Sequence, residues 1–245
     1  MLRFGEPRGK EMNTVHEIME GAELTDSFFD QCVDAVAIGL VGSFLLNRIN
    51  ERWVGGQILE AEAYCQYDPA SHCYGDLRDQ SSGREVSNRA RMHHSMYLSA
   101  GHTYIFPKSR YCHLNFVCRE EGFGAGVLIR SVLPLDECVP HMVRLRKPFV
   151  KYEEYLSKKK RISSGPITLA QALAVTPDLD GRPLRETSLR IFSSKAGEKV
   201  LADRRIGPPQ IRHTIPLAGS GAMFLKAPRR VSTSRSSLRR RFRLA

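Results

Sequence analysis

The segment Ile58–Tyr64, which reads Ile-Leu-Glu-Ala-Glu-Ala-Tyr, constrains the fold more than any other part of the chain. Side chains along a β-strand point alternately to its two faces, and two residues span about 6.6 Å. Glu60, Glu62 and Tyr64 therefore share one face, and the leucine and alanines between them share the other. Two acids and a phenol are costly to bury without partners. The pattern predicts either a site for acid–base chemistry or an edge strand whose acids face water.

Further strand and helix patterns surround this segment. Apolar runs predict strands over 102–106, 111–118 and 124–135, and the polar piece Pro-Lys-Ser-Arg joins the first two as a hairpin. Helical spacing predicts helices over 27–49 and 163–173. Strands mixed with helices, without regular βαβ alternation, indicate an α+β fold. We expect a single mixed domain with a curved, largely antiparallel sheet, surrounded by helices and carrying a protruding β-hairpin.

Four stretches carry little periodic pattern. The polar residues 1–24 are predicted to be a flexible N-terminal arm, the main domain to span 25–233, and residues 234–245 to form a basic C-terminal tail. The stretch Trp-Val-Gly-Gly at 53–56 is typical of a turn. Residues 66–100 are rich in Ser, Asp, Gly and His, and so long a connection inside a compact domain is more often functional than structural.

The balance of charge indicates a polyanionic partner. The chain has 37 Lys and Arg against 26 Asp and Glu, a formal net charge of +11. The excess is uneven, because residues 226–245 contain eight basic residues and no acidic one. Nucleic acid, an acidic membrane surface and an acidic protein are the partners that such a charge favours.

Several classes of protein have no support in the sequence. The longest apolar run, 35–46, has 12 residues, whereas a membrane-spanning helix needs about 20. No apolar signal segment is visible near the N-terminus, so a cytoplasmic location and reduced cysteines are expected. The spacing of Cys and His matches no zinc motif, and no glycine-rich nucleotide loop is present, so neither a metal nor a cofactor is predicted.

Arg130 and a set of planar side chains are the remaining anomalies. A lone guanidinium inside the apolar run Gly-Val-Leu-Ile-Arg-Ser-Val-Leu needs a carboxylate or carbonyl partner, and Glu60 or Glu62 across the sheet could supply it. The alternative is that Arg130 faces solvent from an edge. Planar side chains can stack on an unpaired base or pack in the core; those in question are Tyr64, His72, Phe106, Tyr111 and His113.

Together these residues resemble the alkyladenine (3-methyladenine) DNA glycosylases, in the mammalian-type fold also found in bacteria. Residues 55–75 are similar to the family's Val-Glu-Thr-Glu-Ala-Tyr…Asp-Pro-Ala-Ser-His segment. The likeness continues through 101–106, 111–118 and 124–135, and it covers roughly residues 30–233.

The resemblance implies a monofunctional glycosylase that flips alkylated purines (3-methyladenine, 7-methylguanine, hypoxanthine or etheno-adenine) out of duplex DNA and hydrolyses the N-glycosidic bond. By position, Glu62 is implied to activate the attacking water, and Arg130 to hold that water and the carboxylate. The pocket for the everted base is implied to comprise Tyr64, His72, Phe106 and Asn115, with Phe106 standing where the family usually has tyrosine. A monomer bound to double-stranded DNA, in the bacterial nucleoid or a nucleus, is expected. A weakly active or non-catalytic DNA-binding relative is the alternative.

Three stretches depart from the family pattern. The hairpin is one residue shorter, so Arg110 or Tyr111 is the candidate to wedge into the minor groove in place of the family's tyrosine. Residues 76–97 form a longer connection than usual, and an insertion at 218–222 interrupts the stretch that supplies a carbonyl near the water. These departures bear on efficiency and substrate range more than on the fold.

Overall fold

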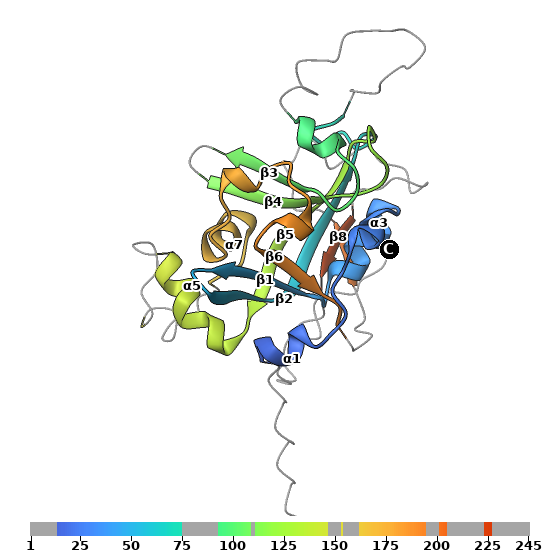
Figure 1. The fold of residues 1–245 in the computed structure, drawn as a ribbon. Coiled ribbons are helices and arrows are strands. Elements are labelled where there is room, and N and C mark those ends of the chain that lie inside the picture. The colour runs from blue at the N-terminus through green and yellow to red at the C-terminus, as the bar shows by residue number, and fades with distance from the viewer. Residues whose placement is uncertain are drawn as a thin grey trace, which may run out of the picture.

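The computed structural model describes residues 14–74, 93–108, 111–146, 153 and 162–194, together with the backbone of 201–204 and 223–226 (Figure 1). Its α-helices are α1 (Val15–Met19), α2 (Asp26–Phe29), α3 (Val33–Leu40), α5 (Val139–Leu145) and α7 (Pro166–Ala172). Short 3-10 helices are η1 (His94–Tyr97), η2 (Asp136–Cys138), η3 (Pro177–Leu179) and η4 (Leu184–Glu186). The strands are β1 (Phe44–Ile49), β2 (Arg52–Cys65), β3 (Thr103–Lys108), β4 (Tyr111–Val117), β5 (Ala125–Pro134), β6 (Leu189–Phe192), β7 (Leu201–Arg204) and β8 (Met223–Lys226).

The strands form one curled sheet around the long strand β2. The order across the sheet is β3–β4–β5–β2–β1–β6, with β8 between β2 and β7, and every described pairing is antiparallel. One edge of β2 pairs with β5, and the other pairs first with β1 and then with β8. Helices α3 and α7 pack against the sheet (Figure 1). The α+β prediction with a β3–β4 hairpin at the sheet edge is therefore confirmed.

The predicted helix over 27–49 is wrong in its second half. The chain forms α2 and α3 and then turns at Gly42, whose φ of 94° favours glycine, before it enters β1. Strand β1 is paired on both sides, with β2 and β6. A fully buried strand reads as a continuous apolar run, which periodicity cannot distinguish from a buried helix.

The predicted turn at 53–56 is also wrong, because these residues continue the strand β2. A Cβ atom on Gly55 would lie 2.1 Å from the Leu45 carbonyl oxygen of β1, and one on Gly56 would lie 1.9 Å from the Leu133 carbonyl oxygen of β5. The two glycines therefore allow the neighbouring strands to approach β2 closely.

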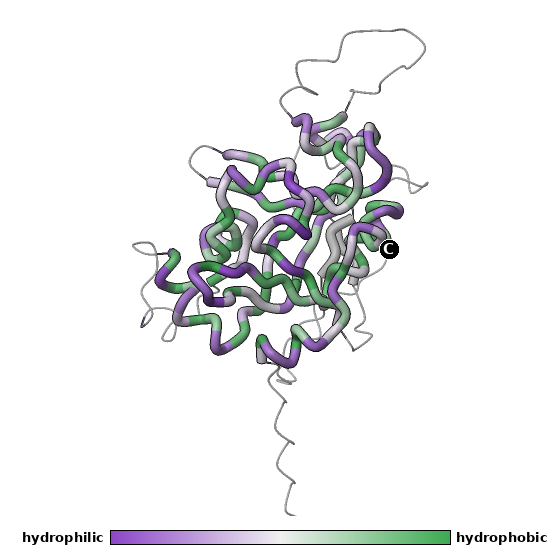
Figure 2. The backbone as a smooth tube through the Cα atoms, viewed as in Figure 1, coloured by the Kyte–Doolittle hydropathy of each residue, from purple (hydrophilic) through white to green (hydrophobic). Residues whose placement is uncertain are grey.

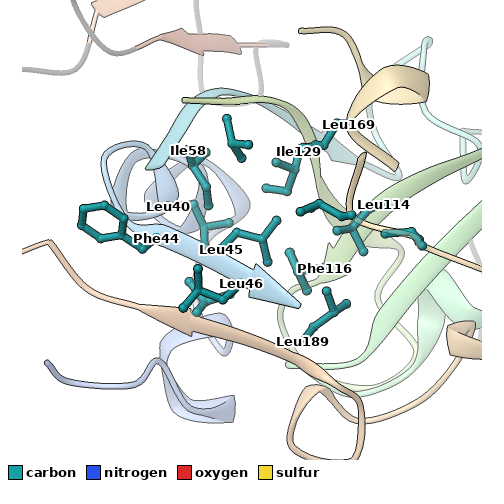
Figure 3. Close-up of a cluster of buried hydrophobic side chains, with 14 of the residues drawn as sticks. Leu40, Phe44, Leu45, Leu46, Ile58, Leu114, Phe116, Ile129, Leu169 and Leu189 are labelled. Carbon is teal, nitrogen blue, oxygen red and sulfur yellow. The ribbon is translucent and has the colours of Figure 1, made fainter. Parts of the chain in front are cut away.

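The main core lies on one face of the sheet, between the strands and the helices (Figure 3). Fully buried side chains include Leu40 of α3, Ile58 of β2, Phe116 of β4 and Leu169 of α7. In Figure 2, hydrophobic stretches follow the strands through the centre, and hydrophilic stretches lie largely at outer turns. A smaller cluster forms on the opposite face from Cys73, Met96, Tyr97, Tyr104 and Val117, with Tyr64 and Phe106 against it.

An irregularity in the β2–β5 pairing changes which side chains face the core. Ile58 pairs with Val132 and Ala61 pairs with Ile129, so one residue of each strand, Leu59 and Arg130, falls outside the regular register. All four of the paired residues are buried in the main core, although strict alternation would place positions three apart on opposite faces. Such bulges re-aim a side chain and are frequent beside active sites. Arg130 lies at this irregularity and keeps the face of Leu128, two residues before it, which is also the face of Glu62.

The packed part of the chain begins before the predicted domain boundary at residue 25. Thr14 caps α1 in a capping box with Glu17, and Val15 and Ile18 are buried. The Leu24 amide donates a hydrogen bond to the Ile191 carbonyl of β6 at 2.8 Å. Residues 14–24, assigned to an arm from their polar composition, are therefore packed against the domain.

Several predictions lie outside the described residues. These are the arm before residue 14, most of the 76–97 connection, Arg110, the insertion at 218–222 and the tail at 234–245. No helix in the described ranges has the length and apolar character needed to cross a membrane.

Candidate active site

Glu62 is a buried carboxylate with a partner on each oxygen. Its side chain is 1% exposed, and Oε1 accepts a hydrogen bond from Arg130 Nη1 at 3.0 Å. Oε2 accepts one from the Tyr64 hydroxyl at 2.8 Å. Charge-assisted bonds of this kind compensate for burying the ionised form. The cross-sheet pairing of Arg130 with a carboxylate of β2, one of the two alternatives left by the sequence, is confirmed for Glu62.

The sheet register aligns Glu62 with other polar side chains on the face opposite the main core. Glu62 pairs with Leu128 of β5, Leu128 pairs with Asn115 of β4, and Asn115 pairs with Tyr104 of β3. Directly paired residues of antiparallel strands share one face of a sheet. One row across four strands therefore carries the carboxylate, the amide and the phenol.

Asn115 is held in one orientation by the backbone of the hairpin. Its Nδ2 donates to the Tyr104 carbonyl at 3.0 Å and to the His113 carbonyl at 3.3 Å, and the residue is 8% exposed. Because both bonds use the amide nitrogen, the amide oxygen Oδ1 takes the opposite edge of the group. An acceptor fixed in this way can discriminate between hydrogen-bonding groups of a ligand.

A cluster of four rings adjoins this row. His72 and His93 stack with centroids 4.6 Å apart and planes 17° apart, and Phe106 lies 4.1 Å from His72. The Tyr104 ring stands nearly perpendicular to both imidazoles, at 82° and 87°. Its hydroxyl lies 2.8 Å from the Nδ1 atom of each histidine. The cluster joins the loop after β2, the residue before η1, and β3.

His113 adds a third imidazole beside Phe106, with centroids 6.0 Å apart. Burial, assisted by the positive charges of Lys108 and Arg130, lowers the pKa of His113 below its usual value of 6.5. Burial also raises the pKa of Tyr104, helped by Cys73 and Asp180. At neutral pH the site therefore presents an uncharged imidazole and an intact phenol.

Of the residues predicted for the site, the structure gathers Glu62, Arg130 and Tyr64 directly. Phe106 lies against His72, as the base-pocket prediction requires of these two rings, and Asn115 joins the same sheet face. Tyr111 stands at the start of β4, opposite Lys108 and four residues from Asn115, so it lies toward the hairpin end rather than beside Glu62. Arg110 is not among the residues described.

The sequence interpretation missed His93 and Tyr104. The alternation in β3 could have identified Tyr104, since it is two residues from Phe106 and shares its face. His93 follows an aperiodic stretch, and no local pattern indicates that it returns to His72. Among the residues that the structure describes, no three His, Cys, Asp or Glu side chains gather as metal ligands.

The carboxylate is closed to solvent. Two surface hollows, of about 490 and 330 Å³, lie beside Trp53 at the opposite end of β2, and Glu62 lines neither of them. The 1% exposure of Glu62 means that a ligand or water can reach it only after neighbouring side chains move.

Comparisons with known proteins agree with the resemblance. A family model described as methylpurine-DNA glycosylase matches residues 27–217. A relative from Agrobacterium fabrum is 34% identical over 187 residues, which cover 76% of this chain and 82% of the relative. A relative from Shouchella clausii is 32% identical over 74% of this chain and 82% of its own. One from Nitrosospira multiformis is 32% identical over 79% of this chain and 88% of its own. All three are provisionally named 3-methyladenine DNA glycosylases.

Proposed function

The chain belongs to the methylpurine-DNA glycosylase family, and on that premise we propose that it is a DNA repair enzyme that releases alkylated purines from duplex DNA. It flips the damaged nucleotide out of the helix, hydrolyses the N-glycosidic bond with a water molecule and leaves an abasic site. The observation that carries this proposal is the buried Glu62 carboxylate, oriented by Arg130 and Tyr64 on the same sheet face as the aromatic cluster.

Glu62 supplies the chemistry of the bond-breaking step. As the bond between C1′ and the purine nitrogen breaks, its electron pair leaves on the purine, and the sugar develops oxocarbenium character. The carboxylate stabilises that positive charge and takes a proton from the water whose oxygen bonds to C1′. Alkylation makes the purine a better leaving group. Its departure therefore depends less on protonation by the enzyme than the departure of an unmodified purine would.

Arg130 and Tyr64 keep the carboxylate in place for this step. Each binds one oxygen of Glu62, at 3.0 and 2.8 Å. A carboxylate held by a hydrogen bond at each oxygen needs little reorientation as the transition state forms. This is what electrostatic preorganisation requires.

The aromatic side chains supply selectivity for the base. Tyr64, His72 and Phe106 present π-faces, and a cationic alkylpurine gains about 0.5–2 kcal/mol over a neutral base from such faces. The uncharged state of His113 at neutral pH avoids repulsion of a cationic purine. The fixed amide of Asn115 is suited to reject the exocyclic amine of guanine.

Binding of the base requires the site to open. Glu62 is 1% exposed, and the rings of His72 and Phe106 are already in contact. We infer that the everted purine separates the two rings and moves the side chains that cover the carboxylate. This movement admits the attacking water. Extrusion of the nucleotide adds selectivity, because damaged and weakly paired bases leave the helix more readily.

Duplex DNA is the partner, and the net charge of +11 supports binding to its phosphates. Arg110 or Tyr111 at the end of the β3–β4 hairpin fills the gap left by the everted base. The protein acts as a monomer, in the bacterial nucleoid or in a nucleus.

Incubation with methylated duplex DNA tests the proposal, with free purines and abasic sites as the readout. Glu62→Gln should reduce base release by about 10²–10⁴-fold while DNA affinity stays within about twofold. The matched control is Glu51→Gln, the same substitution on an exposed residue in the turn before β2; this variant should release purines at the original rate. If the original protein binds methylated DNA but releases no purine, it is a non-catalytic DNA-binding relative.

A further inference from the structure

The larger of the two surface hollows beside Trp53 has the features of a second binding site. Its volume of about 490 Å³ lies within the range of about 300–1,000 Å³ that small-molecule sites occupy. Its walls come from α1, the start of β2, η2 and α5. Arg52, which opens β2, is ten residues from Glu62, and an extended strand of that length spans about 30 Å. A ligand in this hollow would therefore not reach the Glu62 carboxylate.

Backbone contacts hold the walls of the larger hollow together. The Glu137 carboxylate of η2 accepts a hydrogen bond from the Val15 amide of α1 at 2.5 Å. The Leu135 amide, just before η2, donates to the Gly55 carbonyl of β2 at 3.1 Å. Residues 14–24, which pack against the domain, thus supply one wall, and the hollow is formed before any ligand enters.

The charges of the larger hollow differ from those of the smaller one. In the smaller hollow each arginine has a glutamate partner; the pairs are Arg48–Glu51 and Arg190–Glu23. In the larger hollow, neither Arg52 nor Arg144 has an ion pair or a side-chain hydrogen bond within the part of the chain that the structure describes. The lining includes a single acid, Glu137, which already binds the amide of α1. Two guanidinium groups against one carboxylate favour an anionic ligand.

His141 is the third group of the larger hollow that lacks a partner. Both of its ring nitrogens are shielded from solvent, and neither has a hydrogen-bond partner among the described residues. An imidazole carries at least one N–H donor, and a buried donor without an acceptor is unfavourable. Because the nitrogens are shielded, the exposed part of this half-buried side chain is carbon. A half-turn about the Cβ–Cγ bond exchanges each nitrogen with a ring carbon, and an acceptor oxygen in the hollow would then satisfy the N–H.

These three groups lie close enough to influence one another. Burial first, and then the charges of Arg52 and Arg144, lower the pKa of His141 below its usual value of 6.5. His141 and Arg144 are three residues apart on α5 and so share one side of that helix. An anion between them would accept hydrogen bonds from guanidinium and imidazole together, and its charge would offset their mutual repulsion.

Trp53 gives the hollow a planar apolar wall. The residue is half-buried, packs against the main core and lines both hollows. Aromatic faces stack on nucleobases with little dependence on which base is present. A nucleotide combines a base with a phosphate, and the volume of the hollow suits a molecule of that size.

We propose that the larger hollow binds a nucleotide, with its phosphate between Arg52, Arg144 and His141 and its base against Trp53. This would be a second, non-catalytic site, and it goes beyond the proposed function without resting on it. The nucleotide is either free in solution or a unit of an unpaired nucleic-acid strand, since both carry the same phosphate and base.

The fluorescence of Trp53 tests the inference directly, because Trp53 is the only tryptophan in the chain. The full-length protein is titrated with adenosine monophosphate (AMP), with adenosine, and with a single-stranded oligonucleotide. AMP should change the fluorescence saturably, and adenosine should bind at least about tenfold more weakly, because it lacks the phosphate. If the single strand binds more tightly than AMP, the site takes a unit of a strand; otherwise it takes the free nucleotide.

Substitutions of the lining residues identify the groups that bind the phosphate. Arg52→Met and Arg144→Met, both on exposed residues, should each weaken AMP binding about tenfold. His141→Phe keeps a ring, removes both nitrogens and should weaken binding about threefold. The matched control is Arg48→Met in the smaller hollow, which should stay within about twofold at about 0.15 M salt, where exposed charges are screened. Urea midpoints check that each variant is folded.

Three results would each overturn the inference. These are no fluorescence change with either AMP or the single strand, equal affinity for AMP and adenosine, and unchanged AMP affinity in both Arg52→Met and Arg144→Met. Failure of the original protein to release purines from methylated DNA would defeat the proposed function and leave this inference standing, because the hollow lies far from Glu62.

Discussion

The two faces of the central sheet use the same strands for different purposes, and β4 shows the contrast most clearly. Leu114 and Phe116 point into the main core and are fully buried. His113 and Asn115, which alternate with them, lie on the face that carries Glu62 and Tyr104. One strand thus contributes apolar packing on one side and fixed polar groups on the other.

The contrast between the two faces shows how the fold accommodates buried polar groups. On the core face the stabilising term is burial of apolar area, which needs no directional partner. On the site face the Glu62 carboxylate, the Asn115 amide and the Tyr104 hydroxyl each have two hydrogen-bond contacts. Substitutions on the core face should therefore reduce stability, and those on the site face should reduce activity more than stability.

The largest effect on stability is expected on the core face. Phe116 is fully buried, and its ring centroid lies 5.7 Å from that of Phe29. Phe116→Ala should lower the free energy of unfolding by about 3–5 kcal/mol, because it leaves a cavity that the core fills only in part. Urea unfolding gives the stability, and purine release per folded molecule at low temperature should stay within about twofold. A loss of release tenfold or greater in the folded protein would mean that the two faces are not separable.

A smaller loss of stability is expected when the pair on the site face is broken. Arg130→Met removes the counter-charge of Glu62, which is 1% exposed, whereas Arg130 itself is 17% exposed. Removing one partner of a fully buried pair costs about 3–5 kcal/mol, so about 2–3 kcal/mol is expected for this partly exposed pair. Urea unfolding at pH 7 measures the loss.

The double variant Glu62→Gln/Arg130→Met checks the reason for that loss. With no charge left to bury, most of the stability lost in Arg130→Met should return, although purine release should not. If the double variant is as unstable as Arg130→Met, the loss comes from packing of the arginine stem and not from an unpaired carboxylate.

The sequence predicted the neighbours of Glu62 better than it predicted the secondary-structure elements around them. Alternation in β2 correctly placed Glu62 and Tyr64 on one face. For the lone arginine in an apolar run, the structure shows one of the two alternatives that the sequence left open, a carboxylate partner across the sheet. These are local signals, since a period of two and a misplaced charge are both visible within a few residues. The hairpin of β3 and β4 was predictable for the same reason.

What the sequence could not give depends on contacts between distant segments. The sequence of β1 fits a helix as well as a strand, and only its pairing with β2 and β6 identifies it as a strand. Gly55 fits a turn in the sequence; in the structure it is needed because a Cβ atom there would lie 2.1 Å from the Leu45 carbonyl oxygen. The register irregularity at Leu59 and Arg130 can be recognised only when the two strands are compared. His93 meets His72 only because the chain returns to the same place after a long connection.

The smallest expected effect is on the pH dependence of stability. It again contrasts the two faces of β4, because His113 on the site face can titrate and Phe116 on the core face cannot. The pKa of His113 is lowered by burial first, and then by Lys108 and Arg130. The folded protein therefore binds this proton less readily than the unfolded chain, so the stability that the neutral imidazole contributes is present above pH 6.5 and is lost as the pH falls below it.

His113→Gln, which does not titrate, should lose less stability between pH 7.5 and pH 5.5 than the original protein does, as measured by urea midpoints. His102→Gln, on a more exposed histidine outside the site, is the control and should follow the original curve. Equal slopes for His113→Gln and the original protein would show that His113 is protonated as easily in the folded state as in the unfolded one, and that this face is less closed to water than the burial of Glu62 implies.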